Sequence, residues 1–356
     1  MAISKYKNLK EFDGHALVVE LNEPSVDLKG FIAIDRKADK FPALGATRLW
    51  KYSSEEDAIN DALRLAKLMG KKSAMAGLPY TGAKAVLMLP EGGIKNREEY
   101  FKVYAQKVNE LSGQFITGTD VGLTDDDLKI MSENSKFIIG MDVPAAYYTA
   151  VGIFYVIQAS LEYKFGSGNI TGRTFAIQGL GKTGYELLKL LYAEGAKIFV
   201  SEINTDILEQ VCRDFPLVKK VLPEDIHKQE VDVFCPCAMS HSVNSRTVSE
   251  LKCTIVAGSA NNQLEDEAVG EKLHKLGIIY VPDYLSNSGG LISVVDQFEN
   301  KKHNDERILL KLSKIPEVLR AIFLRSEEEQ SSISGVADGM VQEFLNKEVR
   351  VGVRSY

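Results

Sequence analysis

Hydrophobic positions in the first 143 residues form short apolar runs separated by segments of helical spacing. The runs HALVVELN, GFIAIDR, AVLML and QFITGTD have the length and composition of strands. The segment from Ser53 onwards predicts an amphipathic helix, and Ser53 and Glu56 have the spacing of a capping box. Its predicted core face is Ile59, Leu63, Ala66 and Met69. A second helix is predicted in REEYFKVYAQKVNELSG, with Gly113 suited to its left-handed cap.

The pattern changes near Pro144. From there apolar runs and helical segments alternate: RTFAIQ, YELLKLLYAEG, KIFVSE, DILEQVCRDF, VDVFCPC, TIVAGS, EAVGEKLHKLG and IIYVPDY. Alternation of this kind predicts a parallel sheet with helical crossovers. The stretch from about 305 to 347 is predicted to be helical throughout. A chain of 356 residues is also longer than one hydrophobic core usually supports, so the sequence predicts an α/β protein of two domains.

Composition and charge exclude several classes of binding partner and cellular location. The net charge of -6 and the absence of a long Lys/Arg cluster argue against nucleic acid. The N-terminus lacks a basic region followed by an apolar stretch, and no run of about 18 apolar residues occurs, so neither export nor membrane insertion is expected. The four cysteines predict reduced thiols of a cytoplasmic protein, and the C-x-C in VDVFCPCA lacks the spacing of a metal site.

A glycine-rich loop follows the predicted strand TFAIQ. The sequence G-L-G-K-T-G from Gly179 to Gly184 stands between this strand and the helix YELLKLLYAEG, as a dinucleotide site requires. Gly179 permits the tight turn, Gly181 lets the backbone approach a pyrophosphate, and Gly184 allows close packing of helix on strand. Lys182 and Thr183 complete the loop, whose free N–H groups would face the phosphates.

Glu202 ends the next strand, 18 residues after Gly184. An acidic side chain at this place would accept hydrogen bonds from the adenosine ribose and repel a 2'-phosphate. The sequence therefore favours NAD over NADP as the cofactor.

Candidate chemistry lies in the first domain. Lys72 and Lys84 flank an apolar, glycine-containing segment, where desolvation would lower the pKa of an ammonium towards the working pH. Asp120 follows a strand in a Thr/Gly-rich turn, from which it could pass protons if it shares a cleft with the lysines. Oxidising an amine requires a cation for the substrate carboxylate, a base, and a hydride acceptor beside Cα. In isolation, however, most lysines and aspartates are solvated surface residues.

Seven motifs in order resemble the Glu/Leu/Phe/Val dehydrogenase family, and most closely its leucine dehydrogenase branch. They cover nearly the whole chain: PALGATRLW, SEEDAINDALRLAKLM, GLPYTGAK, FITGTDVG, QGLGKTG, AGSANNQL and YVPDYLSNSGG. The resemblance implies NAD-dependent oxidative deamination of an apolar L-amino acid to its 2-oxo acid and ammonia.

The resemblance also implies roles for individual residues. Lys84 is similar to the catalytic lysine that activates water, and Asp120 to its proton-shuttling partner. Lys72 matches the lysine that binds the substrate carboxylate, assisted by Asn262. Thr149 and Asn261 correspond to residues near the nicotinamide end of the cofactor, with Asn287 close by, and Ala238 is a further cofactor-binding position.

Substrate choice is argued at the side-chain pocket. The glutamate-specific branch carries a lysine where this chain has Leu44, next to Gly45, and a buried carboxylate facing Leu44 would lack a counter-charge. Leu291 and Val294 match pocket positions of the leucine branch and would make the pocket apolar. Leucine, valine, isoleucine and phenylalanine stay open as substrates, because one methylene is worth only about 1 to 3 kcal/mol in such pockets.

Three departures from the family pattern keep an alternative open. Thr81 and Ala83 stand where glycines usually precede the catalytic lysine, Ala46 replaces the second glycine of the earlier pair, and Lys71 replaces a tyrosine. Added methyl or hydroxyl groups could narrow the site, so the alternative is an NAD-binding regulatory homologue with weak or lost turnover. A hydroxy-acid dehydrogenase is a third interpretation, but the five histidines lie in no catalytic context that it would need.

The family's architecture gives the expected domains. Residues 1–143 would form the substrate-binding and oligomerisation domain, with the C-terminal helix, 331–356, packing back on it. Residues 144–330 would form a Rossmann domain that binds NAD. A homo-oligomer is expected by the same resemblance.

Overall fold

The computed structural model describes residues 3–37 and 41–351, with side chains described up to Leu345. The chain separates into two compact units. Of the described residues, the first unit contains 3–37, 41–143, 297–302 and 347–351, and the second contains 144–296 and 303–346. The chain therefore passes between the units after residues 143, 296, 302 and 346. The division of tasks between residues 1–143 and residues 144–330 stays a prediction.

The first unit is built on a five-stranded sheet with the order β1-β2-β4-β3-β5. Strands β3, β4 and β5 are parallel, whereas β1 and β2 run antiparallel to their neighbours. The strands are β1 (Leu17–Glu23), β2 (Leu28–Ile34), β3 (Ala43–Trp50), β4 (Thr81–Met88) and β5 (Phe115–Thr119).

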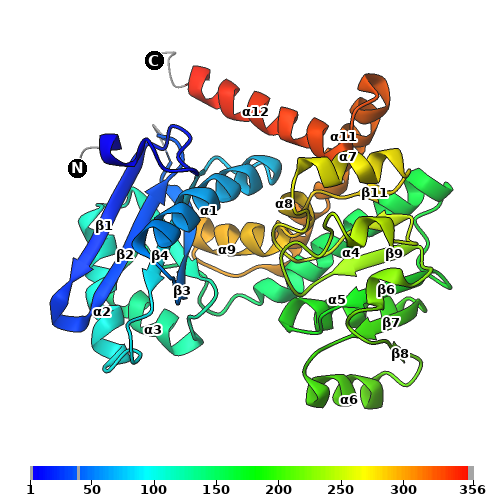
Figure 1. Cartoon of the computed structure of the whole chain (residues 1–356), viewed down its shortest axis with the longest axis horizontal. Helices are drawn as coiled ribbons and strands as arrows, with labels where there is room; N and C mark the ends of the chain where they lie inside the picture. The colour runs from blue at the N-terminus through cyan, green and yellow to red at the C-terminus, as the bar shows by residue number, and fades with distance from the viewer. Residues whose placement is uncertain (1–2, 38–40, 352–356) are drawn as a thin grey trace. The chain divides into compact units, whose positions relative to one another are not determined.

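Helices cover both faces of this sheet (Figure 1). Helix α1 (Glu55–Met75) packs its residues Ala58, Ile59, Ala62, Leu63 and Ala66 on one face. Helices α2 (Arg97–Glu110) and α3 (Asp125–Asn134) cover the other face with a core that includes Tyr100, Tyr104, Leu128 and Met131. With both faces covered, polar side chains of the central strands are held away from bulk water.

The structure differs from the predicted elements at two places that concern the site. Strand β3 was not expected, because PALGATR contains Gly45 and its apolar residues do not alternate with polar ones. Strand β4 begins at Thr81 and not at Ala85, so that Lys84 lies inside a strand. Both strands are central, with neighbours on either side, and central strands need not show the alternation of a half-buried one.

The predicted capping box at Ser53 is wrong by one residue. Helix α1 begins at Glu55, and the Ser54 side chain accepts a hydrogen bond from the N–H of Asp57. Ser53 instead donates to the Asp57 carboxylate at 2.8 Å. A capping side chain has to lie immediately before the first helical residue, which the apolar spacing alone could not fix to one residue.

The second unit contains a six-stranded parallel sheet with the order β11-β10-β9-β6-β7-β8. Helices connect most successive strands, and this confirms the predicted Rossmann fold. The strands are β6 (Thr174–Gln178), β7 (Lys197–Ser201), β8 (Lys219–Lys220), β9 (Val233–Pro236), β10 (Ile255–Val256) and β11 (Ile279–Tyr280). The helices up to the last strand are α4 (Ala145–Phe165), α5 (Lys182–Ala193), α6 (Thr205–Asp214) and α7 (Glu267–Lys275).

The predicted C-terminal helical stretch is interrupted. It consists of α10 (Asp305–Leu312), α11 (Ile315–Glu329) and α12 (Ile333–Val351), preceded by α8 (Asp283–Ser286) and α9 (Gly289–Asn300). Gln330 ends α11 in a left-handed conformation with a φ of 49°. Four short 3-10 helices complete the described elements: Ile3–Tyr6, Pro24–Val26, Ile226–Lys228 and Thr247–Ser249.

Side chains at and before α12 make hydrogen bonds within the second unit, of which they are part. Asp338 accepts a hydrogen bond from Tyr284 at 2.8 Å, and Ser332 donates to Glu271. Residues 352–356, and the side chains after Leu345, lie outside the described part, so the packing of 331–356 on the first domain stays a prediction. Within the ranges 3–37 and 41–351, every helix is too short or too polar to cross a bilayer.

Candidate active site

Lys84 lies in the middle of the sheet of the first unit and is only 4% exposed. Side chains of a strand alternate between its two faces. Ala83 and Ala85 belong to the core under α2 and α3, and Val86 belongs to the core under α1. Lys84 therefore points to the α1 face, where strand β2 presents Ala33 opposite it.

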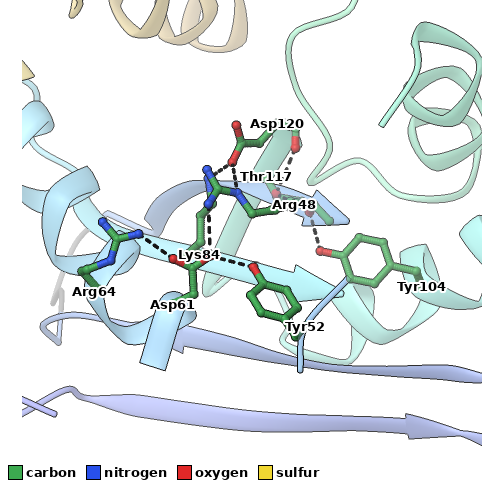
Figure 2. Close-up of polar contacts among 10 residues, drawn as sticks. Arg48, Tyr52, Asp61, Arg64, Lys84, Tyr104, Thr117 and Asp120 are labelled. Carbon is green, nitrogen blue, oxygen red and sulfur yellow. Dashed lines mark hydrogen bonds and ion pairs between the residues drawn. The ribbon is translucent and has the colours of Figure 1, made fainter. Parts of the chain in front are cut away.

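Asp120 comes directly after β5, and its carboxylate accepts a hydrogen bond from the Lys84 ammonium group. The Lys84 Nζ atom donates to Asp120 Oδ2 at 2.6 Å (Figure 2). The backbone fixes this aspartate, because its N–H donates to the Thr47 carbonyl oxygen of β3 at 3.0 Å. Two residues 36 positions apart in sequence are thus brought together by three adjacent parallel strands, β4, β3 and β5.

Arg48 of β3 was quoted in the motif PALGATR but given no role by the sequence. Its Nε donates to the same Oδ2 of Asp120 at 3.0 Å, and its Nη1 donates to Asp61 of α1, also at 3.0 Å. Asp61 also accepts hydrogen bonds of 2.6 Å from Tyr52 and Arg64 (Figure 2). The strand parity of Arg48 could have revealed this contact, but only if β3 had been recognised as a strand.

The opposite face of β3 is fixed by hydroxyl groups. Thr47 Oγ1 lies 2.6 Å from the Tyr104 hydroxyl and 2.8 Å from Thr117 Oγ1. All three side chains are buried. Because Thr47 precedes Arg48 in β3 and Thr117 lies three residues before Asp120, these bonds hold the two strands that carry the charged groups in register.

Burial and neighbouring charges set the protonation of the pair. Burial lowers the pKa of Lys84, against the opposing effect of Asp120, and Arg48 lowers it further. Burial alone would raise the pKa of Asp120, but the charges of Lys84 and Arg48 hold it well below its usual value. The arrangement keeps Asp120 ionised beside a lysine whose pKa is lower than usual.

Lys72 lies half-buried near the end of α1. The backbones of α1 and β4 touch two residues earlier, at Gly70 and Gly82. A Cβ on Gly82 would lie 2.2 Å from the Gly70 nitrogen. Lys72 and Lys84 each follow this contact by two residues, so the helix end and the strand that carry them are neighbours.

The substituted glycines lie on different faces of the sheet. Ala83 is fully buried in the core under α2 and α3, away from the face of Lys84. Its methyl group therefore does not narrow the space around Lys84. Gly45 has no room for a side chain, since a Cβ would lie 2.0 Å from the Ala83 carbonyl oxygen. Leu44 is buried in β3, and Ala46 is half-buried.

In the second unit, the glycine-rich loop lies between β6 and α5. Gly179 has a φ of 93°, which favours glycine, and a Cβ on Gly184 would lie 2.1 Å from the Gly179 carbonyl oxygen. Gly181 caps α5 without a side-chain hydrogen bond, and a Cβ there would meet no atom within 4 Å. Open space beside uncapped N–H groups at Lys182 and Thr183 fits the pyrophosphate of a dinucleotide.

Glu202 follows β7 and lies at this loop. Its carboxylate accepts hydrogen bonds from the N–H of Leu180 at 2.7 Å and the N–H of Asn204 at 3.0 Å. Each carboxylate oxygen can accept a second bond. Glu202 therefore holds the loop and keeps lone pairs for ribose hydroxyl groups.

Amide groups cluster near the start of α9 in the second unit. Asn287 donates to Asn261 Oδ1 at 3.0 Å and to the Ser259 carbonyl oxygen at 3.1 Å. Its own Oδ1 is buried and accepts no hydrogen bond from the described protein atoms. An orphaned buried acceptor is costly, and the carboxamide N–H of a nicotinamide would satisfy it. The residues present thus fit a nicotinamide dinucleotide.

The remaining predicted residues of the second unit have the following places. Thr149 of α4 lies against Gly290, where a Cβ would be 2.5 Å from its hydroxyl oxygen. Ala238 lies against Gly179. Asn262 adopts a left-handed backbone with a φ of 51°. Leu291 and Val294 are both half-buried and lie three residues apart on α9, on one side of the helix.

Some of the predicted residues of each unit are therefore in contact with one another. Lys84 and Asp120 are in direct contact in the first, and Asn261 and Asn287 in the second. The meeting of the two sets around one substrate stays a prediction.

Comparisons with known proteins identify the family to which the chain belongs. Residues 18–137 match the family model for the Glu/Leu/Phe/Val dehydrogenase dimerisation domain, and residues 201–344 match that for glutamate/leucine/phenylalanine/valine dehydrogenase. Leucine dehydrogenase from Bacillus cereus is 36% identical, covering 97% of this chain and 94% of its own length. Phenylalanine dehydrogenase from Lysinibacillus sphaericus is 38% identical, covering 87% and 83%.

A solved structure supports the same assignment. The crystal structure of L-tryptophan dehydrogenase from Nostoc punctiforme superposes with a TM-score of 0.82 at 33% identity, covering 98% of this chain and all of that one. Likeness at this level extends over both units. The chain belongs to the Glu/Leu/Phe/Val dehydrogenase family of amino-acid dehydrogenases, close to leucine dehydrogenase.

Proposed function

We propose that this protein catalyses the NAD-dependent oxidative deamination of an apolar L-amino acid. The overall reaction converts the amino acid, NAD⁺ and water into the 2-oxo acid, ammonium, NADH and a proton. The observation that carries the proposal is the buried Lys84, whose Nζ lies 2.6 Å from Asp120 Oδ2. A buried lysine with a lowered pKa beside an ionised carboxylate is suited to acid and base catalysis near neutral pH.

In this mechanism the residues of the chain divide the work. Lys72 binds the substrate carboxylate, with help from Asn262. Lys84, as a neutral amine, takes a proton from the water that attacks the substrate imine, and Asp120 passes protons to and from the leaving ammonia. When bound, the nicotinamide supplies the hydride acceptor. Hydride loss from Cα forms the imine that this water attacks.

The choice of an apolar substrate is supported by the residues assigned to the side-chain pocket. Leu44, Leu291 and Val294 offer no charge to a substrate carboxylate. The named activities of the relatives, on leucine, phenylalanine and tryptophan, span small and large apolar side chains. We propose a branched aliphatic amino acid first, and phenylalanine next.

Glu202 supports NAD over NADP. A 2'-phosphate beside this carboxylate would meet charge repulsion in place of hydrogen bonds. The carboxylate already accepts a hydrogen bond from the glycine-rich loop, so it cannot turn away without breaking the bond to Leu180.

We also propose that the protein is a homo-oligomer in the cytoplasm. The match of residues 18–137 to a domain described as a dimerisation domain supports self-association through the first unit. The four cysteines are free of disulfides, as reduced thiols would be.

The test is a panel of L-amino acids, each incubated with NAD or NADP while NADH or NADPH, ammonia and 2-oxo acid are measured. We expect equal amounts of the three products from at least one apolar amino acid, little from glutamate, and a preference for NAD. Tight NADH binding without deamination of any amino acid would contradict the proposal and support the regulatory alternative.

A further inference from the structure

We infer that Arg48 is a positioning residue of this active site: its guanidinium, anchored from helix α1, fixes the Asp120 carboxylate against Lys84. This inference rests on the proposed function and extends it to a group that need not touch the substrate. The contacts that carry it are drawn in Figure 2.

One carboxylate oxygen is shared by both cations. Asp120 Oδ2 accepts from Lys84 Nζ at 2.6 Å and from Arg48 Nε at 3.0 Å. The backbone N–H of Val121 also hydrogen-bonds this carboxylate. Arg48 adds a second side-chain donor, from a neighbouring strand and with a planar geometry, and further restricts rotation of the carboxylate about the ammonium.

The guanidinium is itself held from behind. Its Nη1 donates to Asp61 Oδ2, the oxygen that also accepts from Tyr52, while Arg64 binds Asp61 Oδ1. Arg48 thereby bridges two carboxylates with two different nitrogens. A lysine at this position has one nitrogen and could supply the charge but not the bridge.

Arg48 also shifts the pKa of Lys84. The charged groups that act most on Lys84 from the elements packed around it are Asp120 after β5, Arg48 on β3 and Asp61 on α1, and strand β2 places the apolar Ala33 opposite it. Arg48 lowers the pKa of Lys84 and also that of Asp120. Without its charge, the pKa of Lys84 rises, and the neutral amine needed for deamination forms only at higher pH.

A pocket on the first unit gives access to the guanidinium. Its volume is about 480 Å³, and its lining includes Arg48, Trp50, Tyr52, Asp61 and Arg64. The side chain of Arg48 is 21% exposed, whereas that of Lys84 is 6% exposed. A small cation from solution can therefore reach the place of the guanidinium when the arginine is removed.

The experiment compares Arg48→Met and Arg48→Lys with the wild type through the pH dependence of kcat/KM for deamination. In Arg48→Met we expect kcat/KM at neutral pH to fall roughly 10- to 100-fold. We also expect the acid limb of the profile, the low-pH side on which kcat/KM falls as Lys84 becomes protonated, to move up by about one pH unit, the size of shift that a nearby charge causes. In Arg48→Lys we expect a smaller fall, about tenfold, with the acid limb unmoved, because charge is kept and the bridge is lost.

Arg64→Met is the matched control, because Arg64 binds Asp61 but does not touch Asp120. We expect its kcat/KM to stay within about threefold of the wild type, as for removal of a half-exposed ion pair. Guanidinium chloride at millimolar concentration should raise the activity of Arg48→Ala but not that of Lys84→Ala. A loss of rate in Arg48→Met with an unmoved acid limb, together with no guanidinium rescue of Arg48→Ala, would overturn the inference.

A readout without turnover separates this inference from the proposed function. The rate of acetylation of Lys84 by acetic anhydride, followed by mass spectrometry of its peptide across pH, reports when the amine becomes neutral. We expect its midpoint to be higher in Arg48→Met than in the wild type, even if no amino acid is deaminated. Equal midpoints in the two folded proteins would contradict the role of Arg48, whereas an inactive wild type would contradict only the proposed function.

Discussion

The two units bring together their candidate site groups by opposite means. In the first, charged side chains on or next to three strands and a helix hydrogen-bond one another. Asp120 Oδ2 accepts from two cations, and Asp61 accepts from three side chains. In the second, the dinucleotide loop is made by leaving side chains out, at Gly179, Gly181 and Gly184. The first arrangement is suited to moving protons, and the second to admitting a ligand against backbone N–H groups.

The largest expected effect separates chemistry from folding. Lys84→Ala removes the proposed base, so kcat/KM for deamination should fall roughly 10²- to 10⁴-fold, the usual contribution of general acid and base groups. The measurement is NADH formation from the preferred amino acid, with thermal unfolding to show that the variant is folded. A folded variant that retains more than a tenth of the activity would contradict the proposed mechanism.

Removing the Asp120 carboxylate tests the direction in which its charge shifts the pKa of Lys84. Asp120→Asn should lower kcat roughly 10- to 100-fold, because an amide cannot carry the proton. Asp120 raises the pKa of Lys84, so its loss lowers that pKa and moves the acid limb of kcat/KM to lower pH. Arg48→Met is expected to move the same limb to higher pH. If both variants shift it in the same direction, the account of the charges is wrong.

In the second unit, the role of the loop glycines is tested by adding a methyl group at each of two positions. Gly184→Ala places a methyl group 2.1 Å from the Gly179 carbonyl oxygen, so we expect a loss of about 1 to 3 kcal/mol in the free energy of unfolding and weaker NADH binding. Gly181→Ala meets no protein atom within 4 Å and should leave stability nearly unchanged while it weakens NADH binding. Denaturant unfolding and NADH titration measure the two effects. Equal stability losses in the two variants would refute the distinction.

The smallest effect concerns the beginning of α1, away from both sites. Ser54→Ala removes the side chain that accepts from the Asp57 N–H and should cost about 1 kcal/mol of stability without changing kcat. Ser53→Ala, one residue earlier, should cost less, because its hydroxyl binds an exposed carboxylate. Thermal unfolding of the two variants would settle which serine is the cap.

The same contrast explains what the sequence could predict. The dinucleotide loop is made of parts that follow one another along the chain: a strand, the glycines, a helix and an acidic residue. The sequence G-L-G-K-T-G and Glu202 therefore made it recognisable. The pairing of Lys84 with Asp120 depends on strand order, which places β3 between β4 and β5. The sequence indicated both residues but not their contact. It gave no sign of Arg48 as their neighbour, because β3 lacks the alternation of a half-buried strand.

The C-terminal region shows a second limit. Apolar spacing from 305 to 347 is consistent with one long helix, but three helices are present. One break follows a left-handed Gln330, a residue type for which that conformation is uncommon. Apolar spacing could not predict this break, because the spacing continues across it and nothing in a glutamine indicates a left-handed conformation.

The claim that the first unit performs the chemistry and the second holds the cofactor is tested most directly by titrating NADH into Lys84→Ala by calorimetry. The account predicts a dissociation constant within about threefold of the wild type in a protein whose turnover is lost, because the proposed base binds no part of the dinucleotide. A dissociation constant weakened as much as kcat/KM would contradict this division of labour.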